Sequence, residues 1–274
     1  MDKTFDISVV LGSKNRKGLI KATINSIRNN GFPGSIEIIV IDGGSVDGTC
    51  DWLAKQKDVF TIIQPNYSIE RDGIKVKAHS WGEFMNIAFK YAHSDYVVMI
   101  SDDIILAEGC LKKGYDTMVT ELRNGNKIGG GAFYFREYPR MDYYRVVVLP
   151  NDNININHGF YYRPALESVN WLDEKSYNFY CGDGDIAMRL NLAGWKTIPL
   201  PQCFAAHLVH LPKRKGTIPL SIKNDISTFN ALYPVQPTVG KLISDSTANI
   251  DTKPFWIHGF KNVIAGYLMK ILKK

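Results

Sequence analysis

The chain contains few cysteines, and those it has form no motif. The four cysteines, Cys50, Cys110, Cys181 and Cys203, lie far apart in the sequence and include no CxxC pair. This spacing argues against a disulfide framework and against a structural zinc site, and it is typical of proteins from a reducing compartment. We therefore expect a cytoplasmic protein.

Long apolar runs, internal repeats and low-complexity tracts are also absent. No stretch of about 18 or more uncharged apolar residues occurs, so no membrane-spanning helix is expected. The N-terminus, MDKTFDISVV, leads straight into a strand pattern and lacks the layout of a signal peptide. The formal net charge of +6 comes without an arginine-rich stripe interleaved with aromatic residues, so nucleic acid is not an expected partner.

Strand and helix patterns alternate in the first half of the sequence. The residue patterns predict strands over 6–11, 36–41, 59–63 and 96–100, and helices over 19–28, 46–57 and 81–92. Strands that alternate with helices of this length imply βαβ units and a mostly parallel sheet that is covered on both faces. The expected fold class is therefore α/β, with a Rossmann-like sheet and helices on both its faces.

The second half of the sequence is less regular. The patterns predict strands over 129–135, 143–149 and 156–163, a helix over 185–193 that Gly194 ends, and extended segments at 196–199 and 203–208. After Pro212 the composition shifts towards Lys, Pro and Ser. We therefore predict one domain over 1–212 and a helical, basic and amphipathic extension over 213–274.

Three carboxylates stand at the ends of predicted strands. Asp42 ends the second strand, and the adjacent pair Asp102 and Asp103 follows the fourth. Ligands of open α/β sheets bind beyond the carboxyl ends of the strands. Adjacent like charges need a counter-charge, so the pair either holds a cation that carries a phosphate or forms the polar end of a strand.

The stretch IEIIVIDGGSVDGT at 36–49 joins a strand to a helix start. Gly43 and Gly44 permit a tight turn, and Ser45 or Asp47 is able to cap the following helix. By itself the stretch indicates only a βα turn with a good cap.

Together these motifs resemble those of the family-2 glycosyltransferases, which have the GT-A fold of the nucleotide-diphospho-sugar transferase superfamily. The resemblance covers residues 6–208 in order. It is carried by SVVLGSKNR at 8–16, IDGGSVDGT at 41–49, SDD at 101–103, WLDE at 171–174 and GDGDIAMRL at 182–190. It implies a nucleotide-sugar half over about 1–105 and an acceptor half over about 106–212.

The resemblance also implies roles for particular residues. The implied donor-binding residues are Gly12, Ser13, Asn15, Asp42, Gly44, Asn86 and Asp102. Asp103 is the implied metal ligand, and hard oxygen ligands suit Mg²⁺ or Mn²⁺. His207 lies where family members often carry a histidine; it either adds a nitrogen ligand, which favours Mn²⁺, or is a hydrogen-bonded core residue. His210 is the nearby alternative.

Asp183 is the implied catalytic base, with Trp171 and Asp185 as implied acceptor-binding residues. A helix N-terminus favours the charged carboxylate, so we expect burial by the substrate to bring the pKa of Asp183 back towards the working range. The other interpretation of residues 182–185 is a turn that only caps a helix. A single base without a covalent nucleophile implies inversion at the anomeric carbon.

The expected activity is a metal-dependent, inverting glycosyltransferase of the hexosyltransferase type. It would move a sugar from a nucleotide-diphosphate donor, with UDP expected first, to a hydroxyl of a glycan, a lipid-linked saccharide or a surface polysaccharide. Two departures from the family pattern, Gly43 in place of an aspartate and Ser101 in the metal motif, leave open a decayed nucleotide-sugar or glycan-binding module. The basic loop 12–18 leaves open a sugar-phosphate nucleotidyltransferase.

The C-terminal segment 255–274 places apolar residues at spacings of three and four and carries lysines. Such a face either lies on an anionic membrane surface or packs on the domain or on a second copy of the chain. The corresponding expectations are a peripheral location at the inner face of the membrane, or a homo-oligomer.

Overall fold

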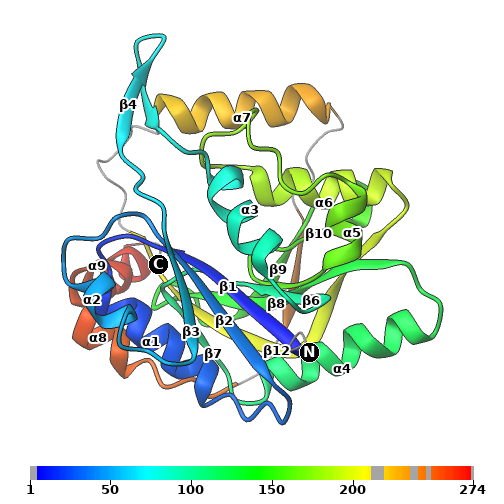
Figure 1. The fold of residues 1–274 in the computed structure, drawn as a ribbon, viewed down its shortest axis with the longest axis horizontal. Coiled ribbons are helices and arrows are strands. Elements are labelled where there is room, and N and C mark those ends of the chain that lie inside the picture. Colours follow the sequence, from blue (N-terminus) through cyan, green and yellow to red (C-terminus); the bar gives the residue numbers. More distant parts are fainter. Residues whose placement is uncertain (1–4, 211–218, 235–239, 245–247, 273–274) are drawn as a thin grey trace.

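The computed structural model describes residues 5–210, 219–234, 240–244 and 248–272. Figure 1 shows a twisted central sheet with helices on both faces. The predicted domain boundary at 212 lies outside the described residues, as do the basic run at 213–215 and the last two lysines. No helix of the described residues is long and apolar enough to cross a membrane.

The nucleotide-sugar half forms a parallel sheet, as its alternating pattern predicts. β1 (Ile7–Ser13) lies between β2 (Ile36–Asp42) and β6 (Tyr96–Met99), and β3 (Val59–Ile63) lies beyond β2. All three pairings are parallel. The carboxyl ends of β1, β2 and β6 therefore meet at one edge of the sheet.

The second half continues the sheet with mostly antiparallel strands. Its strands are β7 (Ile104–Leu106), β8 (Ile128–Tyr138), β9 (Tyr144–Val148), β10 (Ile154–Asn155), β11 (Gly159–Tyr162) and β12 (Lys196–Leu208). β11 is antiparallel to β6 and joins the two halves. The two extended segments predicted at 196–199 and 203–208 are one strand, β12, whose register against β8 shifts between them.

Helices cover both faces because successive strand residues point to opposite sides. In β1, Val9 and Leu11 join the core under α1 (Lys17–Arg28) and α4 (Cys110–Arg123), whereas Val10 faces α3 (Trp81–Tyr91). On this second face also lie α5 (Arg163–Ser168) and α6 (Gly182–Leu192). Burial on both faces explains why residues 9–11 of this strand are all apolar.

Local chemistry sets the helix ends. Ser80 caps α3, since its Oγ accepts the backbone N–H of Glu83 at 3.0 Å. The helix predicted over 46–57 is only α2 (Thr49–Leu53). It begins late because its N-cap residue, Gly48, has a φ of 82°; Oδ1 of Asp47 accepts the N–H of Thr49 at 3.1 Å. Gly194 follows α6 with a φ of 79°, as expected of a helix end.

A hairpin that the sequence patterns did not indicate projects from the body of the molecule. It consists of β4 (Ser68–Arg71) and β5 (Ile74–Lys77), which pair with each other alone (Figure 1). Asp72 and Gly73 turn the chain with positive φ values of 53° and 71°. The hairpin lies beside α7 (Leu220–Leu232), the first helix of the extension.

The extension is not purely helical, which corrects the prediction for 213–274. Its strand β13 (Gly240–Ser244) is antiparallel to β9 and so joins the main sheet. The helix predicted over 255–274 is divided at Gly259 into α8 (Lys253–His258) and α9 (Phe260–Ile271). A side chain at Gly259 would collide with Leu208, so close packing on β12 accompanies this break.

Candidate active site

Two loops at the carboxyl edge of the sheet are tied together by hydrogen bonds. Asp42 is fully buried beside Ser13 in the parallel register of β1 and β2. Its carboxylate accepts the backbone N–H and the hydroxyl of Ser45, both at 2.7 Å. Asn15 donates its backbone N–H to Ser45 Oγ at 2.8 Å and accepts the N–H of Val46 at 2.7 Å. These bonds fix the edge at which a donor is expected to bind.

Two glycines of the predicted donor set shape these loops. A Cβ on Gly12 would lie 2.8 Å from the ring of Phe84, so glycine lets α3 pack closely on β1. Gly44 has a φ of 78° and lies against Pro65. Gly12 is therefore needed for close packing and Gly44 for its backbone conformation. Contact of either one with a donor stays a prediction.

The adjacent aspartates share one arginine. Nη1 of Arg16 lies 2.9 Å from Asp102 Oδ1 and 2.7 Å from Asp103 Oδ2. Ser13 donates its hydroxyl to Asp102 Oδ2 at 2.7 Å. Burial, together with the charge of Asp103, raises the pKa of Asp102 to about 6. The counter-charge that the pair requires is thus supplied in this structure by Arg16, which the sequence analysis did not assign.

Asp103, His207 and His210 form a cluster with the composition of a metal site. One ligand atom of each lies within 4.8 Å of the other two. Nε2 of His207 is 3.3 Å from Asp103 Oδ1, and Nε2 of His210 is 3.3 Å from Oδ2. β12 brings His207 to this position because it pairs with β7 so that His207 lies opposite Ile104. The predicted ligand and its nearby alternative therefore both lie beside Asp103.

The charge state of Asp103 fits a cation ligand. Burial alone would raise the pKa of this carboxyl, but His207, Arg16 and His210 outweigh burial and lower it well below its ordinary value. Oδ1 of Asp103 is buried and accepts no hydrogen bond from any described residue. An ionised carboxylate with an unused oxygen beside two imidazoles is able to bind a divalent metal ion.

A third histidine lies behind this cluster. The ring centroid of His158 is 5.3 Å from that of His207, and Phe135 packs edge-on against both rings. Burial, together with His207, lowers the pKa of His158 to about 3. His158 is therefore neutral and adds no charge to the site. Its position in the sequence showed no metal-ligand spacing and gave no signal.

Asp183, the predicted base, lies in the first turn of α6 and is partly exposed. Its Oδ2 accepts the side-chain amides of Asn157 at 2.5 Å and Asn155 at 3.2 Å, and its Oδ1 accepts the N–H of Gly184 at 3.0 Å. Burial raises the pKa of Asp183 above its ordinary value, although these hydrogen bonds oppose the rise. The pKa is therefore raised before any substrate binds, which differs from the expectation based on the helix N-terminus.

One short segment contacts both Asp183 and the metal cluster. Asn157 holds Asp183, and the next residue, His158, packs against His207. The signal in the sequence for this segment is its asparagine-rich stretch NDNININ at 151–157. From the turn between β10 and β11, Asn157 holds the predicted base and His158 packs against the metal cluster.

The two predicted acceptor residues are engaged with the protein itself. Asp185 is 2% exposed and forms an ion pair with Arg189 at 2.7 Å. It also accepts the hydroxyls of Tyr177 and Tyr233 at 3.2 and 2.8 Å. The carbonyl of Trp171 accepts Nη1 of Arg189 at 2.7 Å. These contacts give Asp185 a structural role, and an acceptor contact for Trp171 stays a prediction.

Asn86, a predicted donor residue, also has a structural role. It is 2% exposed, and its amide donates to Leu172 O at 3.0 Å and to Glu174 Oε1 at 2.8 Å. Its Oδ1 accepts the N–H of Leu172 at 3.0 Å. The side chain thus joins α3 to the loop before α6, and its protein partners occupy both amide hydrogens.

The extension supports the helix that carries the base. Asp225 of α7 is 4% exposed, and its carboxylate accepts three consecutive backbone N–H groups, those of Asn178, Phe179 and Tyr180, at 2.8–2.9 Å. Asp183 follows Tyr180 by three positions. The extension therefore fixes the loop that leads directly to the base, which no sequence pattern indicated.

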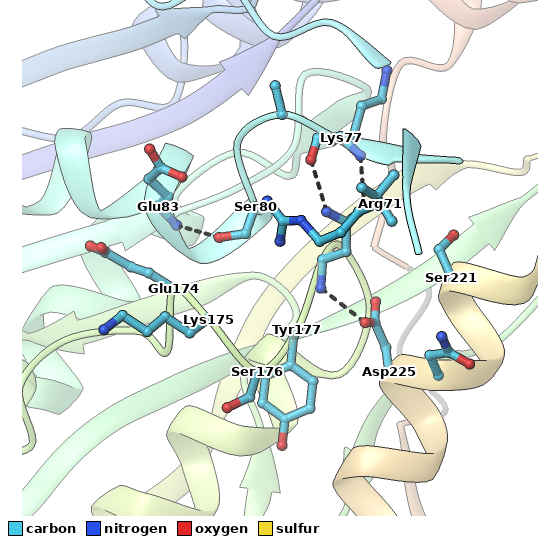
Figure 2. A pocket seen from close by; sticks show the side chains of 14 residues that line it. Arg71, Lys77, Ser80, Glu83, Glu174, Lys175, Ser176, Tyr177, Ser221 and Asp225 are labelled. Atoms are coloured by element: carbon cyan, nitrogen blue, oxygen red, sulfur yellow. Dashed lines mark hydrogen bonds between the residues drawn. The ribbon is translucent and has the colours of Figure 1, made fainter. Parts of the chain in front are cut away.

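A polar cavity of about 340 Å³ lies between the hairpin, the start of α3, the loop 174–178 and α7. Figure 2 shows its lining, with Arg71 extending across the middle towards Ser80. Glu83 and Glu174 lie to one side and Asp225 to the other. Neither the metal cluster nor Asp183 lines this cavity.

Comparisons with known proteins identify the family and the fold of the chain. The model of the family "Glycosyl transferase family 2" matches residues 8–164, which is more than half of the chain. No curated protein matches the chain.

Solved structures show the likeness in fold. One neighbour is S. aureus TarS 1–349 in complex with UDP-GlcNAc (TM-score 0.58, 15% identity, 82% of this chain and 65% of that chain). Another is S. aureus TarS 1–349 alone (0.54, 15%), of whose length this chain covers 60%. A third is the mannosyltransferase PcManGT from Pyrobaculum calidifontis with GDP-Man and Mn²⁺ (0.54, 15%, 100% of this chain and 89% of that chain). The chain therefore belongs to glycosyl transferase family 2 and has the GT-A fold.

Proposed function

We propose that the protein is a metal-dependent, inverting glycosyltransferase that moves a sugar from a nucleotide-diphosphate donor to a hydroxyl of a glycan, a lipid-linked saccharide or a surface polysaccharide. The observation that carries this proposal is the cluster of Asp103, His207 and His210 at the carboxyl edge of the sheet. UDP is the donor nucleotide we propose first, because a TarS structure contains UDP. GDP is the alternative, because the mannosyltransferase structure contains GDP-Man.

The three side chains suit Mn²⁺ as the bound ion. Two imidazole nitrogens and one carboxylate oxygen favour a transition-metal ion, whereas Mg²⁺ prefers oxygen ligands. When bound, such an ion supplies positive charge that stabilises the nucleoside diphosphate as it leaves. Asp103 and the two histidines would hold it, and the unused Oδ1 of Asp103 supports this assignment.

Arg16 and Ser13 complete the polar surroundings of the diphosphate. Arg16 is 37% exposed at its side chain, so its guanidinium is open to solvent while it bonds both aspartates. A guanidinium is well suited to phosphate oxygens. We propose that it binds the donor diphosphate.

Asp183 takes the proton of the acceptor hydroxyl. Asn155 and Asn157 hold one carboxylate oxygen, and a raised pKa makes the group a better proton acceptor when it is ionised. Attack by the acceptor oxygen on the anomeric carbon then displaces the nucleoside diphosphate. A single displacement inverts the configuration at that carbon.

A thermal-unfolding panel of UDP- and GDP-sugars with and without Mn²⁺ tests the proposal. A ligand at 100 times its dissociation constant stabilises the folded state by about 2.7 kcal/mol. We expect stabilisation that requires both nucleotide and Mn²⁺ in the wild-type chain and is lost in Asp103→Asn. No stabilisation by any nucleotide with metal would refute the proposal, and release of pyrophosphate instead of nucleoside diphosphate would identify a nucleotidyltransferase.

We also propose that α9 attaches the enzyme to the cytoplasmic face of an anionic membrane. Large apolar side chains of the C-terminal helices are exposed, among them Ile257, Phe260, Leu268 and Ile271. Lysines contribute only about 1 kcal/mol each near an anionic surface, and Lys270 is already paired with Asp142. The apolar side chains must therefore provide most of the affinity, and attachment is reversible.

Vesicle flotation tests the membrane proposal. We expect binding to vesicles with anionic phosphatidylglycerol, weaker binding to phosphatidylcholine, and loss of binding in Phe260→Glu. Leu192→Glu removes an exposed apolar side chain from α6 and serves as the control. A dimer in size-exclusion chromatography that Phe260→Glu dissociates would instead assign this face to self-association.

A further inference from the structure

The polar cavity between the β4–β5 hairpin and α7 is lined by carboxylates and by cations, which differ in whether they have partners within the protein. Its three carboxylates are each occupied: Glu83 by His79 at 2.6 Å, Glu174 by Asn86 at 2.8 Å, and Asp225 by backbone N–H groups. The carboxylates of all three are thus already bonded to partners within the protein.

Two cations of the same lining are not paired in this way. Within the described parts of the chain, no carboxylate lies in ion-pair distance of Arg71 or Lys175. Arg71 crosses the middle of the cavity in Figure 2. The cavity therefore presents two cations that form no ion pair, together with the neutral polar side chains of Ser221 and Asn224. Such a combination suits a ligand that bears both hydroxyl groups and an anionic group.

The cavity lies against the loop that leads to the base. Asn178 lines it, and the backbone of residues 178–180 is fixed by Asp225 just before α6 begins at Gly182. Tyr177, another lining residue, donates its hydroxyl to Asp185 in the first turn of α6. A ligand in the cavity would therefore contact the segment that positions Asp183.

We propose that this cavity binds an anionic saccharide unit of the acceptor, a sugar that carries a phosphate or a carboxylate. Arg71 and Lys175 bind the anionic group, and Ser221 and Asn224 bind hydroxyls. The site holds the acceptor away from the donor and presents a further hydroxyl to Asp183. This assignment rests on the proposed glycosyltransfer reaction.

Binding of small probes tests the assignment without knowledge of the acceptor. Glucose 1-phosphate and glucuronate carry the two anionic groups, methyl glucoside is the neutral sugar, and inorganic phosphate is the anion alone. We expect ligand-detected NMR titration to show binding of at least one anionic sugar, about tenfold weaker binding of methyl glucoside, and about tenfold weaker binding of the anionic sugar to Arg71→Gln and Lys175→Gln. Whichever anionic sugar binds more tightly identifies the group.

Matched variants keep the test specific. Arg123→Gln and Lys113→Gln change exposed cations of α4, far from the cavity lining, and should bind the probe as the wild type does. Because Arg71 and Lys175 are exposed, their replacement should leave the unfolding temperature unchanged.

Three results would overturn the assignment. Inorganic phosphate that binds as tightly as both sugars would show an anion site only. Equal binding by wild type and Arg71→Gln would place the probe elsewhere. Displacement of the probe by UDP with Mn²⁺ would make the cavity part of the donor site. Failure of UDP to bind at all would instead count against the proposed function and leave probe binding unaffected.

Discussion

The carboxylates of Asp103 and Asp183 are held in opposite ways. Asp103 is surrounded by two histidines and Arg16, which lower its pKa, whereas Asp183 is held by neutral amides and a backbone N–H while burial raises its pKa. Two carboxylates whose surroundings separate their pKa values are suited to different tasks. Charged neighbours keep Asp103 ionised, as its proposed role as a cation ligand requires, and neutral neighbours suit the proposed role of Asp183 as a proton acceptor.

Removal of the proposed base should reduce activity more than any other change considered below. Asp183→Asn keeps the shape of the side chain but cannot accept the acceptor proton, so we expect kcat to fall by about 10²–10⁴-fold. Stabilisation by UDP with Mn²⁺ should stay unchanged. Asp116→Asn, an exposed aspartate of α4, serves as the control for steady-state rates. A variant with wild-type kcat would show that another group takes the proton.

Removal of the ion-binding carboxylate should give a smaller loss of rate with a different signature. Asp103→Asn leaves an uncharged side chain between two histidines, and we expect activity to fall by about 10²–10³-fold, since charge stabilisation of the leaving group is lost. Unlike the Asp183 variant, it should also lose Mn²⁺ binding in calorimetric titration. Retention of Mn²⁺ affinity would contradict the distinction between the two carboxylates.

Loosening of the loop before the base should affect catalysis more than donor binding. Asp225→Asn removes the charge that binds three backbone N–H groups, and we expect kcat to fall by about tenfold, with a loss of about 1.5–3 kcal/mol in the free energy of unfolding. The donor KM should change little. Asp251→Asn, exposed in the same extension, is the control. An equal rise in donor KM would assign α7 to the donor side instead.

The smallest expected effect concerns the pH profile. Asp183 must be ionised to act as a base, so activity should fall as the pH drops through its raised pKa. The amide of Asn157 stabilises the ionised form. Asn157→Ala should therefore raise this pKa further and move the acidic limb of the kcat profile to higher pH, with about a three- to tenfold loss on that limb.

Asn126→Ala, an exposed asparagine that bonds Glu121, is the control for the pH experiment. Its profile should match that of the wild type. An acidic limb that stays in place in Asn157→Ala would show that it reports a group other than Asp183.

The sequence predicted the parts of this site that lie at strand ends. Asp42, Asp102 and Asp103 follow apolar strands, and parallel pairing brings such ends to one edge. The partners of these residues were predicted less well. Arg16 was not assigned a role. Asn86 was predicted to bind the donor and Asp185 the acceptor, although both side chains bond within the protein. Residue type and spacing reveal that a polar group is present but not which group it bonds in the folded protein.

Residues far apart in the sequence explain what was missed. Asn157 is separated from Asp183 by 26 positions, and Asp225 lies 47 positions after the amide of Asn178. Neither pair belongs to a local motif. The loop between β10 and β11 and the packing of α7 bring them together, and both depend on contacts across the whole domain.

The sequence by itself determined the α/β class, the position of three carboxylates at strand ends and the family motifs, because these follow from local periodicity and from residues adjacent in the chain. Only the tertiary structure decided how each charge is compensated. The pKa values of Asp103 and Asp183 depend on burial and on neighbours contributed by distant segments. The energy of a buried charge depends on the atoms within a few ångströms, and folding alone selects those atoms.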